Sequence, residues 1–266
     1  MPVTPRPVAL VTGAARRVGR AIALDLARAG HDVALHFRSS QAEAEATASA
    51  IRETGARAEL MQADLAIEAA CEALVPATVQ RLGRLDAVVH NASLFEYDDV
   101  SSFSYGAMER HWRANTAAAV VLARALHAHL GERASDARGC VIHLLDQKLW
   151  NPNPDYLSYT LSKAALEAAT TLLAQALAPR VRVAGVAPGV TLLSGDMNHG
   201  EFTQAHAMTP LERSSTPEDI ARAVRFLVES PAITGTTLLV DGGQHLSAQP
   251  RDVIFIAREG GKKETR

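Results

Sequence analysis

The sequence has little of several things that often identify a function. Cys71 and Cys140 are the only cysteines among 266 residues, too few and too far apart for a metal cluster or a disulfide framework. The net charge of -2 gives no basic footprint for nucleic acid, and no apolar run approaches the roughly 18 residues that span a bilayer. We therefore expect buried, reduced thiols, and neither a nucleic-acid-binding protein nor a membrane protein.

The start of the chain does not resemble an export signal. The apolar run Val8–Val11 is too short for the core of a secretory signal. With 47% apolar and 21% charged residues, the composition favours a globular protein, which we expect in the cytoplasm. We predict one domain over residues 1–248 and a C-terminal tail, residues 249–266, whose last seven residues are solvated and disordered.

Short apolar runs alternate with longer stretches of helical spacing along the whole chain. The runs are continuous rather than alternating in polarity, as expected for parallel strands covered on both faces. The sequence therefore predicts an α/β fold, a single-domain, Rossmann-type, doubly wound parallel sheet of about seven strands. The predicted strands are Val8–Val11, Asp32–Phe37, Ala58–Gln62, Leu85–His90, Gly139–Leu145, Val181–Val186 and Thr237–Val240.

One segment departs from this alternation. Residues 190–212 mix glycine, histidine and methionine without a clear period, and they follow a predicted strand at its carboxyl end. Ligands of open α/β sheets bind at that edge. We therefore interpret residues 190–212 as a lid over the substrate.

A glycine-containing turn comes directly after the first predicted strand. Gly13 and Gly19 flank it, and a helical pattern follows. Glycine permits close approach of a backbone, and a helix amino terminus offers N–H groups and the positive end of its dipole to a phosphate. A bare connection of this kind would bind nothing, but its position after the first strand favours a dinucleotide site.

The end of the second strand indicates which dinucleotide is bound. An acidic residue there often contacts the ribose hydroxyls of NAD, and this chain has none at that point. Arg38 and Ser39 instead suit the 2'-phosphate of NADPH, through charge-assisted hydrogen bonds. The alternative is a surface arginine followed by an ordinary serine cap.

Tyr159 and Lys163 lie four residues apart in a predicted helix, which places them on one face. A phenol has a pKa near 10, and a nearby ammonium lowers that pKa by stabilising the phenolate. The pair therefore suits a proton donor at neutral pH. In isolation such a pair is more often a surface coincidence, and the nucleotide turn upstream favours the catalytic interpretation.

Several motifs in one order resemble the short-chain dehydrogenase/reductase family over residues 8–245. They are Thr12-Gly13 with Gly19, Asp64-Leu65, Asn91-Ala92, Asn115, Tyr159 with Lys163, Pro188-Gly189 and Val240-Asp241-Gly242-Gly243. The resemblance implies that Asn115 holds a water in a proton relay beside Tyr159 and Lys163. It implies a cofactor site made of Gly13, Arg17, Val18, Gly19, His36, Arg38, Ser39, Asp64, Leu65, Asn91, Ala92, Tyr159, Lys163, Pro188 and Gly189.

Two departures from the family pattern point to one branch of it. Arg17 stands where the family usually has a second turn glycine, and Asp146 stands where it has a catalytic serine. Both occur in pteridine reductases and in their bacterial dihydrofolate or dihydromonapterin reductase relatives. The resemblance therefore implies a pterin or folate substrate.

The chemistry of such a substrate agrees with Asp146. Reduction of a ring C=N bond requires a proton at nitrogen, and a carboxyl group beside Tyr159 can feed that relay. The resemblance adds Asp146 to the catalytic residues and implies substrate contacts at Arg17, Ser93, Phe95, Asp146 and Tyr159. Phe95 would stack on a flat ring and Ser93 would hydrogen-bond its polar edge. The alternatives are loop packing for Phe95 and a structural carboxylate at Asp146.

Two other functions remain open at this point. A related reductase of a ketone, sugar or acyl thioester would keep Tyr159 and Lys163 but leave Arg17 and Asp146 unexplained. An NADPH-binding regulatory protein without turnover would leave the intact Asn115 unexplained.

The resemblance also implies an assembly. We expect a homotetramer built on two long, alanine-rich helices, residues 105–131 and 158–178. The histidines His90, His111 and His143 are interpreted as packing or hydrogen-bonding residues, because no acid or nucleophile is spaced with them as a triad.

Overall fold

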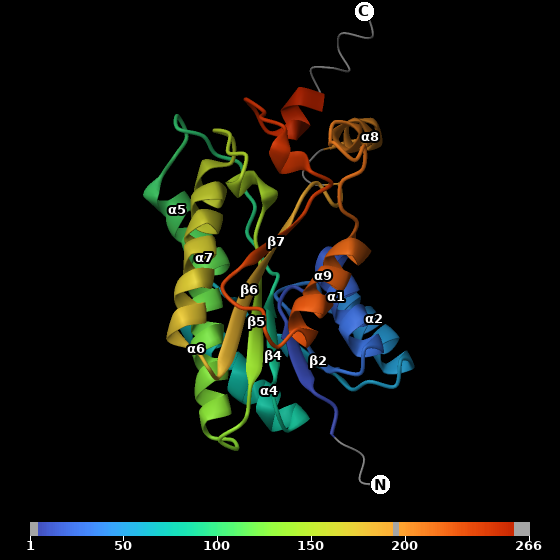
Figure 1. Cartoon of the computed structure of the whole chain (residues 1–266), viewed down its shortest axis with the longest axis vertical. Helices are drawn as coiled ribbons and strands as arrows, with labels where there is room; N and C mark the ends of the chain where they lie inside the picture. Colours follow the sequence, from blue (N-terminus) through green and yellow to red (C-terminus); the bar gives the residue numbers. More distant parts are fainter. Residues whose placement is uncertain (1–4, 194–196, 258–266) are drawn as a thin grey trace, which may run out of the picture.

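The computed structural model describes residues 5–193 and 197–257. Within these ranges seven strands form one parallel sheet, in the order β3-β2-β1-β4-β5-β6-β7. Helices cover both faces, with α1, α2 and α9 on one side and α4, α6 and α7 on the other (Figure 1). The strands are β1 (Val8–Val11), β2 (Asp32–Phe37), β3 (Ala58–Gln62), β4 (Ala87–His90), β5 (Gly139–Leu144), β6 (Val181–Pro188) and β7 (Thr237–Val240).

The predicted fold class and strands are confirmed. Four strands have the predicted bounds, and three differ by one or two residues at one end. β4 begins at Ala87 rather than Leu85, and β6 continues past Val186 to Pro188, which pairs with Val240 of β7. The helices are α1 (Arg17–Arg28), α2 (Gln41–Glu53), α3 (Glu68–Glu72), α4 (Leu74–Leu82), α5 (Tyr105–His111), α6 (Ala118–Gly131), α7 (Leu157–Ala176), α8 (His199–Ala207) and α9 (Pro217–Glu229).

The sheet is buried on both faces, which accounts for its continuous apolar runs. β1 and β2 are buried at every position. One core cluster packs α1, α2 and α9 against the sheet, and a second packs α4 and α6 against the opposite face. No described helix is long and apolar enough to cross a membrane.

The order of the strands determines where a ligand can enter. β1 pairs with β2 on one side and with β4 on the other, so the chain leaves β1 and β4 in opposite directions. A crevice opens outside the carboxyl ends of two such strands. The turn after β1 and the segment after β4 both begin at this crevice.

The helix predicted over residues 105–131 contains an interruption. α5 and α6 are joined without a break by a π-helical turn, Trp112–Ala117, in which Asn115 is buried. π-turns within helices often mark functional sites, because the altered hydrogen bonding redirects side chains. Asn115 therefore leaves the helix at a position that a regular α-helix would not give it.

The two segments that the sequence analysis set apart both contain helical structure. Residues 199–207 of the predicted lid form α8, which Asn198 and Glu201 cap reciprocally. Part of the predicted tail is folded against the domain, because residues 253–257 are helical and Val253, Ile254 and Ala257 are buried. The predicted disorder of the last seven residues falls outside the described residues.

Three sheet histidines are buried next to the carboxyl edge. His36, His90 and His143 are at most 2% exposed. Burial lowers the pKa of His143 to about 3 and that of His36 to about 4, and it lowers the pKa of His90 well below its usual value. The imidazoles are therefore neutral in the folded protein, as expected for packing residues.

We expect the free energy of unfolding to fall steeply as the pH drops below 6.5. A histidine with a depressed folded pKa stays neutral while the unfolded chain takes up protons, so its stability contribution is lost from pH 6.5 downward. His36 and His143 should each cost about 2 kcal/mol between pH 7 and pH 5. Urea denaturation of wild type and His143→Leu at both pH values measures this. Parallel pH dependence in the two proteins would show that His143 does not contribute.

Candidate active site

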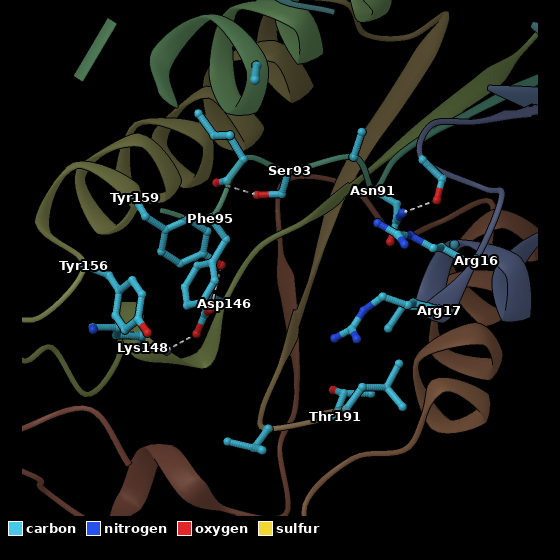
Figure 2. A pocket seen from close by; sticks show the side chains of 18 of the residues that line it. Arg16, Arg17, Asn91, Ser93, Phe95, Asp146, Lys148, Tyr156, Tyr159 and Thr191 are labelled. Carbon is cyan, nitrogen blue, oxygen red and sulfur yellow. Dashed lines mark hydrogen bonds between the residues drawn. The ribbon is translucent and has the colours of Figure 1, made fainter. Parts of the chain in front are cut away.

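A cavity of about 560 Å³ lies at the carboxyl edge of the sheet (Figure 2). Residues of the turn between Gly13 and Gly19, called the phosphate turn below, form one side of it, and Tyr159 with its neighbours forms the other. Predicted site residues on its wall are Gly13, Arg17, Val18, Gly19, His36, Arg38, Ser39, Asp64, Leu65, Asn91, Ala92, Ser93, Phe95, Asp146, Tyr159 and Gly189. Asn115, Lys163 and Pro188 are the predicted residues that do not line it.

The turn after β1 leaves no room for a larger residue at Gly19. A Cβ at Gly19 would lie 2.2 Å from the carbonyl oxygen of Gly13 and 2.6 Å from Asn91 Nδ2. Gly13 itself has φ +63°, in the left-handed region that favours glycine. The start of α1 is therefore held close to β4, with its first N–H groups at the cavity.

Asn91 and Thr12 tie β4 to this turn. Asn91 Nδ2 donates to the carbonyl oxygens of Thr12 at 2.9 Å and Gly13 at 3.2 Å. The backbone N–H groups of Asn91 and Ala92 both donate to Thr12 Oγ1 at 2.9 Å. The Asn91 amide thus fixes the shape of the turn.

His36 also helps to fix the shape of the turn after β1. Its Nδ1 accepts a hydrogen bond from Gly13 N at 3.1 Å, so the neutral ring donates from Nε2 to Ala63 O at 3.1 Å. The pKa of about 4 that burial imposes keeps this arrangement through the neutral range. His36 therefore connects β2, β3 and the turn.

Arg17 adopts a backbone conformation that usually requires glycine. Its φ is +56°, which costs a residue with a side chain on the order of 1–3 kcal/mol. The guanidinium extends along the cavity, and Nη1 donates to Leu193 O at 2.8 Å. Burial and the neighbouring Arg16 both lower the Arg17 pKa. Arg17 therefore connects the phosphate turn to the segment after β6.

Arg38 and Ser39 lie on the cavity wall where β2 ends, and both are exposed. Asp64 and Leu65 follow β3 on the neighbouring part of the wall. Gln62 Nε2 donates to Arg38 O at 3.1 Å, which joins these two strand ends. The guanidinium is thus available to an anion in this part of the cavity.

Tyr159 and Asp146 form a hydrogen-bonded pair on the opposite wall. The Tyr159 hydroxyl donates to Asp146 Oδ2 at 2.7 Å, and Lys148 N donates to Asp146 Oδ1 at 2.8 Å. Burial raises the pKa of the Asp146 carboxyl, although both hydrogen bonds oppose the rise. Burial and Asp146 raise the pKa of the Tyr159 phenol well above 10. The phenol therefore holds its proton.

The rise in the Tyr159 pKa is opposite to the lowering that the spacing of Tyr159 and Lys163 predicts. Lys163 Nζ lies 5.7 Å from the Tyr159 ring centroid and donates to Leu144 O at 2.6 Å. Burial lowers the Lys163 pKa to about 8, against the raising effect of Asp146. The carboxylate in contact with the phenol oxygen, together with burial, outweighs the more distant ammonium. The expected lowering of the Tyr159 pKa is thus wrong for this structure.

Asn115 holds the loop that carries Ser93 and Phe95. Its Oδ1 accepts from Leu94 N at 2.7 Å and from Ser93 Oγ at 3.2 Å. Its Nδ2 donates to Leu94 O and to Ser162 Oγ, each at 3.0 Å. The π-helical turn brings the Asn115 amide to this loop. The side chain therefore positions the loop from behind the cavity wall.

Phe95 lies against a tyrosine that the sequence analysis missed. Its ring stacks on Tyr156, with centroids 4.3 Å apart and an interplanar angle of 16°, and meets the Tyr159 ring edge-on at 4.7 Å. Figure 2 shows the three rings together on one side of the cavity. Tyr156 precedes α7 and lies one helical turn before Tyr159, a spacing that could have identified it.

Other wall residues also went unpredicted. Several belong to the turn after Asp146, and four belong to the segment assigned to the tail, so composition gave no sign of them. These additional wall residues include Gln147, Lys148, Asn151, Asn153, Tyr156, Gln244, Gln249, Asp252, Val253 and Ile254.

Known proteins share both the sequence pattern and the fold. A family model described as enoyl-(acyl carrier protein) reductase matches residues 13–245. Pteridine reductase 1 of Leishmania tarentolae is 32% identical, over 91% of this chain and 97% of that protein. A 3-oxoacyl-[acyl-carrier-protein] reductase of Synechocystis is 31% identical, over 89% and 96%. The crystal structure of FolM alternative dihydrofolate reductase 1 from Brucella canis, complexed with NADP, superposes with a TM-score of 0.85 at 40% identity, over 92% and 97%.

Proposed function

This chain belongs to the short-chain dehydrogenase/reductase family, and from that premise we propose that it reduces a pterin-type substrate, a dihydropterin or dihydrofolate, with NADPH. Tyr159 donates the proton. The proposal rests chiefly on one observation, the hydrogen bond from the Tyr159 hydroxyl to the Asp146 carboxylate. A carboxylate at this point suits protonation of a ring nitrogen, whereas a carbonyl oxygen needs only a hydroxyl donor.

The residues at the phosphate turn fit a dinucleotide with a 2'-phosphate. Gly13 and Gly19 let the turn pack closely against Asn91 and Ala92, which places the start of α1 at the cavity for its pyrophosphate, and Arg38 with Ser39 provides donors for the additional phosphate. When bound, NADPH supplies the hydride. In the Brucella canis structure, NADP accompanies a related fold at 40% identity, which supports this choice of cofactor.

The protein's own part in the reaction is to hold and move a proton. Because burial and Asp146 keep the phenol protonated, the Tyr159 hydroxyl is ready to give its proton to a ring nitrogen at the cavity. Once Tyr159 has given up its proton, Asp146 takes up a proton from water in the cavity, which its raised pKa favours, and passes it to the Tyr159 oxygen. Lys163 fixes the same region through Leu144 and adds a positive charge beside the phenolate that forms.

The substrate ring is proposed to lie between the cofactor and Phe95. One face of the Phe95 ring is covered by Tyr156, and that stacking holds Phe95 as a flat wall. Arg17 provides donors for the polar edge of a pterin, the Ser93 oxygen provides an acceptor, and Asp146 and Tyr159 are proposed to lie at its reducible bond. Asn115 supports this arrangement through the loop it holds.

The direct test is NADPH oxidation measured across dihydrobiopterin, dihydrofolate, dihydromonapterin, quinones and acetoacetyl thioesters. We expect turnover with the dihydropterins or with dihydrofolate. Efficient turnover of the thioester or a simple ketone without any pterin reduction would favour a carbonyl reductase, the chemistry named for the Synechocystis relative. NADPH binding without turnover of any substrate would favour a regulatory protein.

We expect Arg38→Asp to reverse or abolish a preference for NADPH over NADH. The guanidinium contacts only the cofactor that carries the phosphate, and a charge-assisted hydrogen bond is worth about 1.5–3 kcal/mol. Fluorescence titration of both cofactors measures the ratio of dissociation constants. Arg81→Asp, a charge reversal on α4, is the control. Equal affinity of wild type for NADH and NADPH would contradict the assignment.

We also propose a cytoplasmic homotetramer. Leu161 and Leu172 of α7 are 46% and 63% exposed, which supports a partner on that helix. Light scattering after gel filtration should give four times 28.3 kDa. A monomer at micromolar concentration would contradict this assembly.

A further inference from the structure

The segment 249–257 is locked to the domain by a buried carboxylate. Asp155 is 3% exposed and lies just before α7. Arg251 Nε donates to Asp155 Oδ2 at 2.8 Å, Arg251 Nη2 donates to Oδ1 at 2.8 Å, and Asp252 N donates to Oδ2 at 2.8 Å. A bidentate arginine with a backbone donor is a strong, directional attachment. Residues 251 and 252 are therefore held in one place beside the cavity.

Lys148 connects residues 249–257 to the hydrogen-bonded pair of Tyr159 and Asp146. Its side chain is 4% exposed, and Nζ donates to Asp155 O at 2.6 Å and lies 3.3 Å from Asp252 Oδ2. Its own backbone N–H donates to Asp146. One residue therefore connects Asp146 to Asp252, and the Asp252 charge adds to the effects of burial and Asp146 that raise the Tyr159 pKa.

A row of aromatic rings along the wall connects residues 249–257 to Phe95. Phe255 stacks on Tyr156 at 6.5 Å between centroids, and Tyr156 stacks on Phe95 at 4.3 Å. Arg251 lies over the Phe255 ring at 4.6 Å. The position of Phe95 thus depends on the C-terminal segment as well as on Asn115.

Asp252 retains capacity to accept hydrogen bonds within the cavity. It lines the cavity, and among residues 5–193 and 197–257 its carboxylate has hydrogen bonds from Lys148 Nζ and Ile254 N, both long at 3.3 Å. A carboxylate offers about four lone-pair sites. Lys148, which it contacts, lies across the cavity from Arg17 (Figure 2). The Asp252 carboxylate therefore faces the end of the cavity away from the phosphate turn.

The surroundings of Asp252 favour an uncharged donor over an anion. The cavity wall also includes three carboxamides, Gln147, Asn151 and Gln249. Gln147 is 8% exposed, and within the described part of the chain its Oε1 has no hydrogen-bond partner. Lys148 is already engaged with Asp155 and Asp252, so the Asp252 carboxylate offers an acceptor for an O–H or N–H group rather than a site for an anion.

We propose that Asp252 is a specificity residue, whose carboxylate accepts a hydrogen bond from an O–H or N–H donor on the substituent of the reducible ring. This inference rests on the proposed function, because it places the ring between the cofactor and Phe95. It assigns the C-terminal segment to the substrate site and selects substrates with a neutral, donor-bearing substituent.

The experiment compares two dihydropterins that share the same ring system and differ in their substituent. Dihydrobiopterin carries hydroxyl donors, and 6-methyl-7,8-dihydropterin carries none. We expect Asp252→Ala to lower kcat/KM for dihydrobiopterin by about 10-fold or more, mostly through KM, in the range lost with a hydrogen bond to a charged group. Loss of the Asp252 charge near Tyr159 acts on both substrates alike, so kcat/KM for the methyl compound should fall by at least about 5-fold less than kcat/KM for dihydrobiopterin. Asp252→Asn keeps an acceptor oxygen and should restore part of the loss.

The control is Asp136→Asn, which removes a charge from the exposed loop before β5. NADPH affinity should be the same in all variants. An equal loss with both substrates would mean that Asp252 only holds the segment, and no loss with either would mean that it has no role; both overturn the inference and leave pterin reduction intact. If wild type reduces neither dihydropterin, the proposed function fails and the inference fails with it.

Discussion

Tyr159→Phe should lower turnover by about two or more orders of magnitude, the range contributed by a positioned acid. The variant keeps the ring that meets Phe95 edge-on and removes only the hydroxyl that donates to Asp146. NADPH binding should survive, because the phosphate turn lies on the other side of the cavity. Initial rates at saturating substrate, with a separate NADPH titration, measure the two effects.

The matched control is Tyr105→Phe. Tyr105 begins α5 and is 88% exposed, so loss of its hydroxyl should leave turnover unchanged. Turnover of Tyr159→Phe close to that of wild type would remove Tyr159 from the mechanism. Loss of NADPH affinity in parallel with turnover would instead indicate a damaged fold.

Asp146→Ser should depress dihydropterin reduction by about 100-fold or more while NADPH affinity changes little, as expected when a proton relay is broken. Serine is the residue that the family usually has at this position. It can still hydrogen-bond Tyr159, but it cannot hold and return a proton as the carboxyl does. The measurement is kcat and KM for a dihydropterin, with Asp136→Ser as the control for loss of a carboxylate.

Two outcomes would contradict this role of Asp146. Unchanged pterin turnover in Asp146→Ser would make the carboxylate structural, consistent with its acceptance of the Lys148 N–H at the start of a short helical turn. Efficient reduction of a simple ketone by wild type, with no reduction of any pterin or folate, would remove the reason for a carboxyl group at this point.

The fold could be predicted because the sheet is covered on both faces. Continuous apolar runs such as Val8–Val11 and Asp32–Phe37 correspond to strands buried at every position, so pattern and structure agree. The π-helical turn at Trp112–Ala117 could not be predicted from the sequence pattern. Its residues suit an ordinary helix, and its conformation depends on packing against α7, where Thr116 Oγ1 donates to Ser162 O.

The part of the cavity wall that carries Arg38 and Asp64 was predictable because these residues follow strand ends in sequence. Arg38 and Asp64 follow β2 and β3, where a parallel sheet places its ligand. The substrate side was only partly predictable, because it is made by contacts between distant segments. Asp155 and Arg251 are 96 residues apart, and neither has a spacing that indicates the other.

The sign of the Tyr159 pKa shift shows a further limit of sequence reasoning. Spacing gave the distance along the helix to Lys163, and from it an expected lowering. The contact between the phenol and Asp146 depends on where β5 ends relative to α7, and burial depends on the whole cavity. Which charge dominates is therefore decided by tertiary structure.

The arrangement of the cavity has a consequence for the order in which the protein is made. The phosphate turn, Arg38, Asp64 and Asn91 all lie within the first 91 residues, so this half of the site leaves the ribosome early. Residues 249–257 are synthesised after β7, so their contacts with Asp155 can form only when all the strands of the sheet have been made. Domains form from the amino-terminal side during synthesis, and long-range contacts form slowly. A nascent chain can therefore form the turn after β1 well before it can complete the wall that residues 249–257 supply.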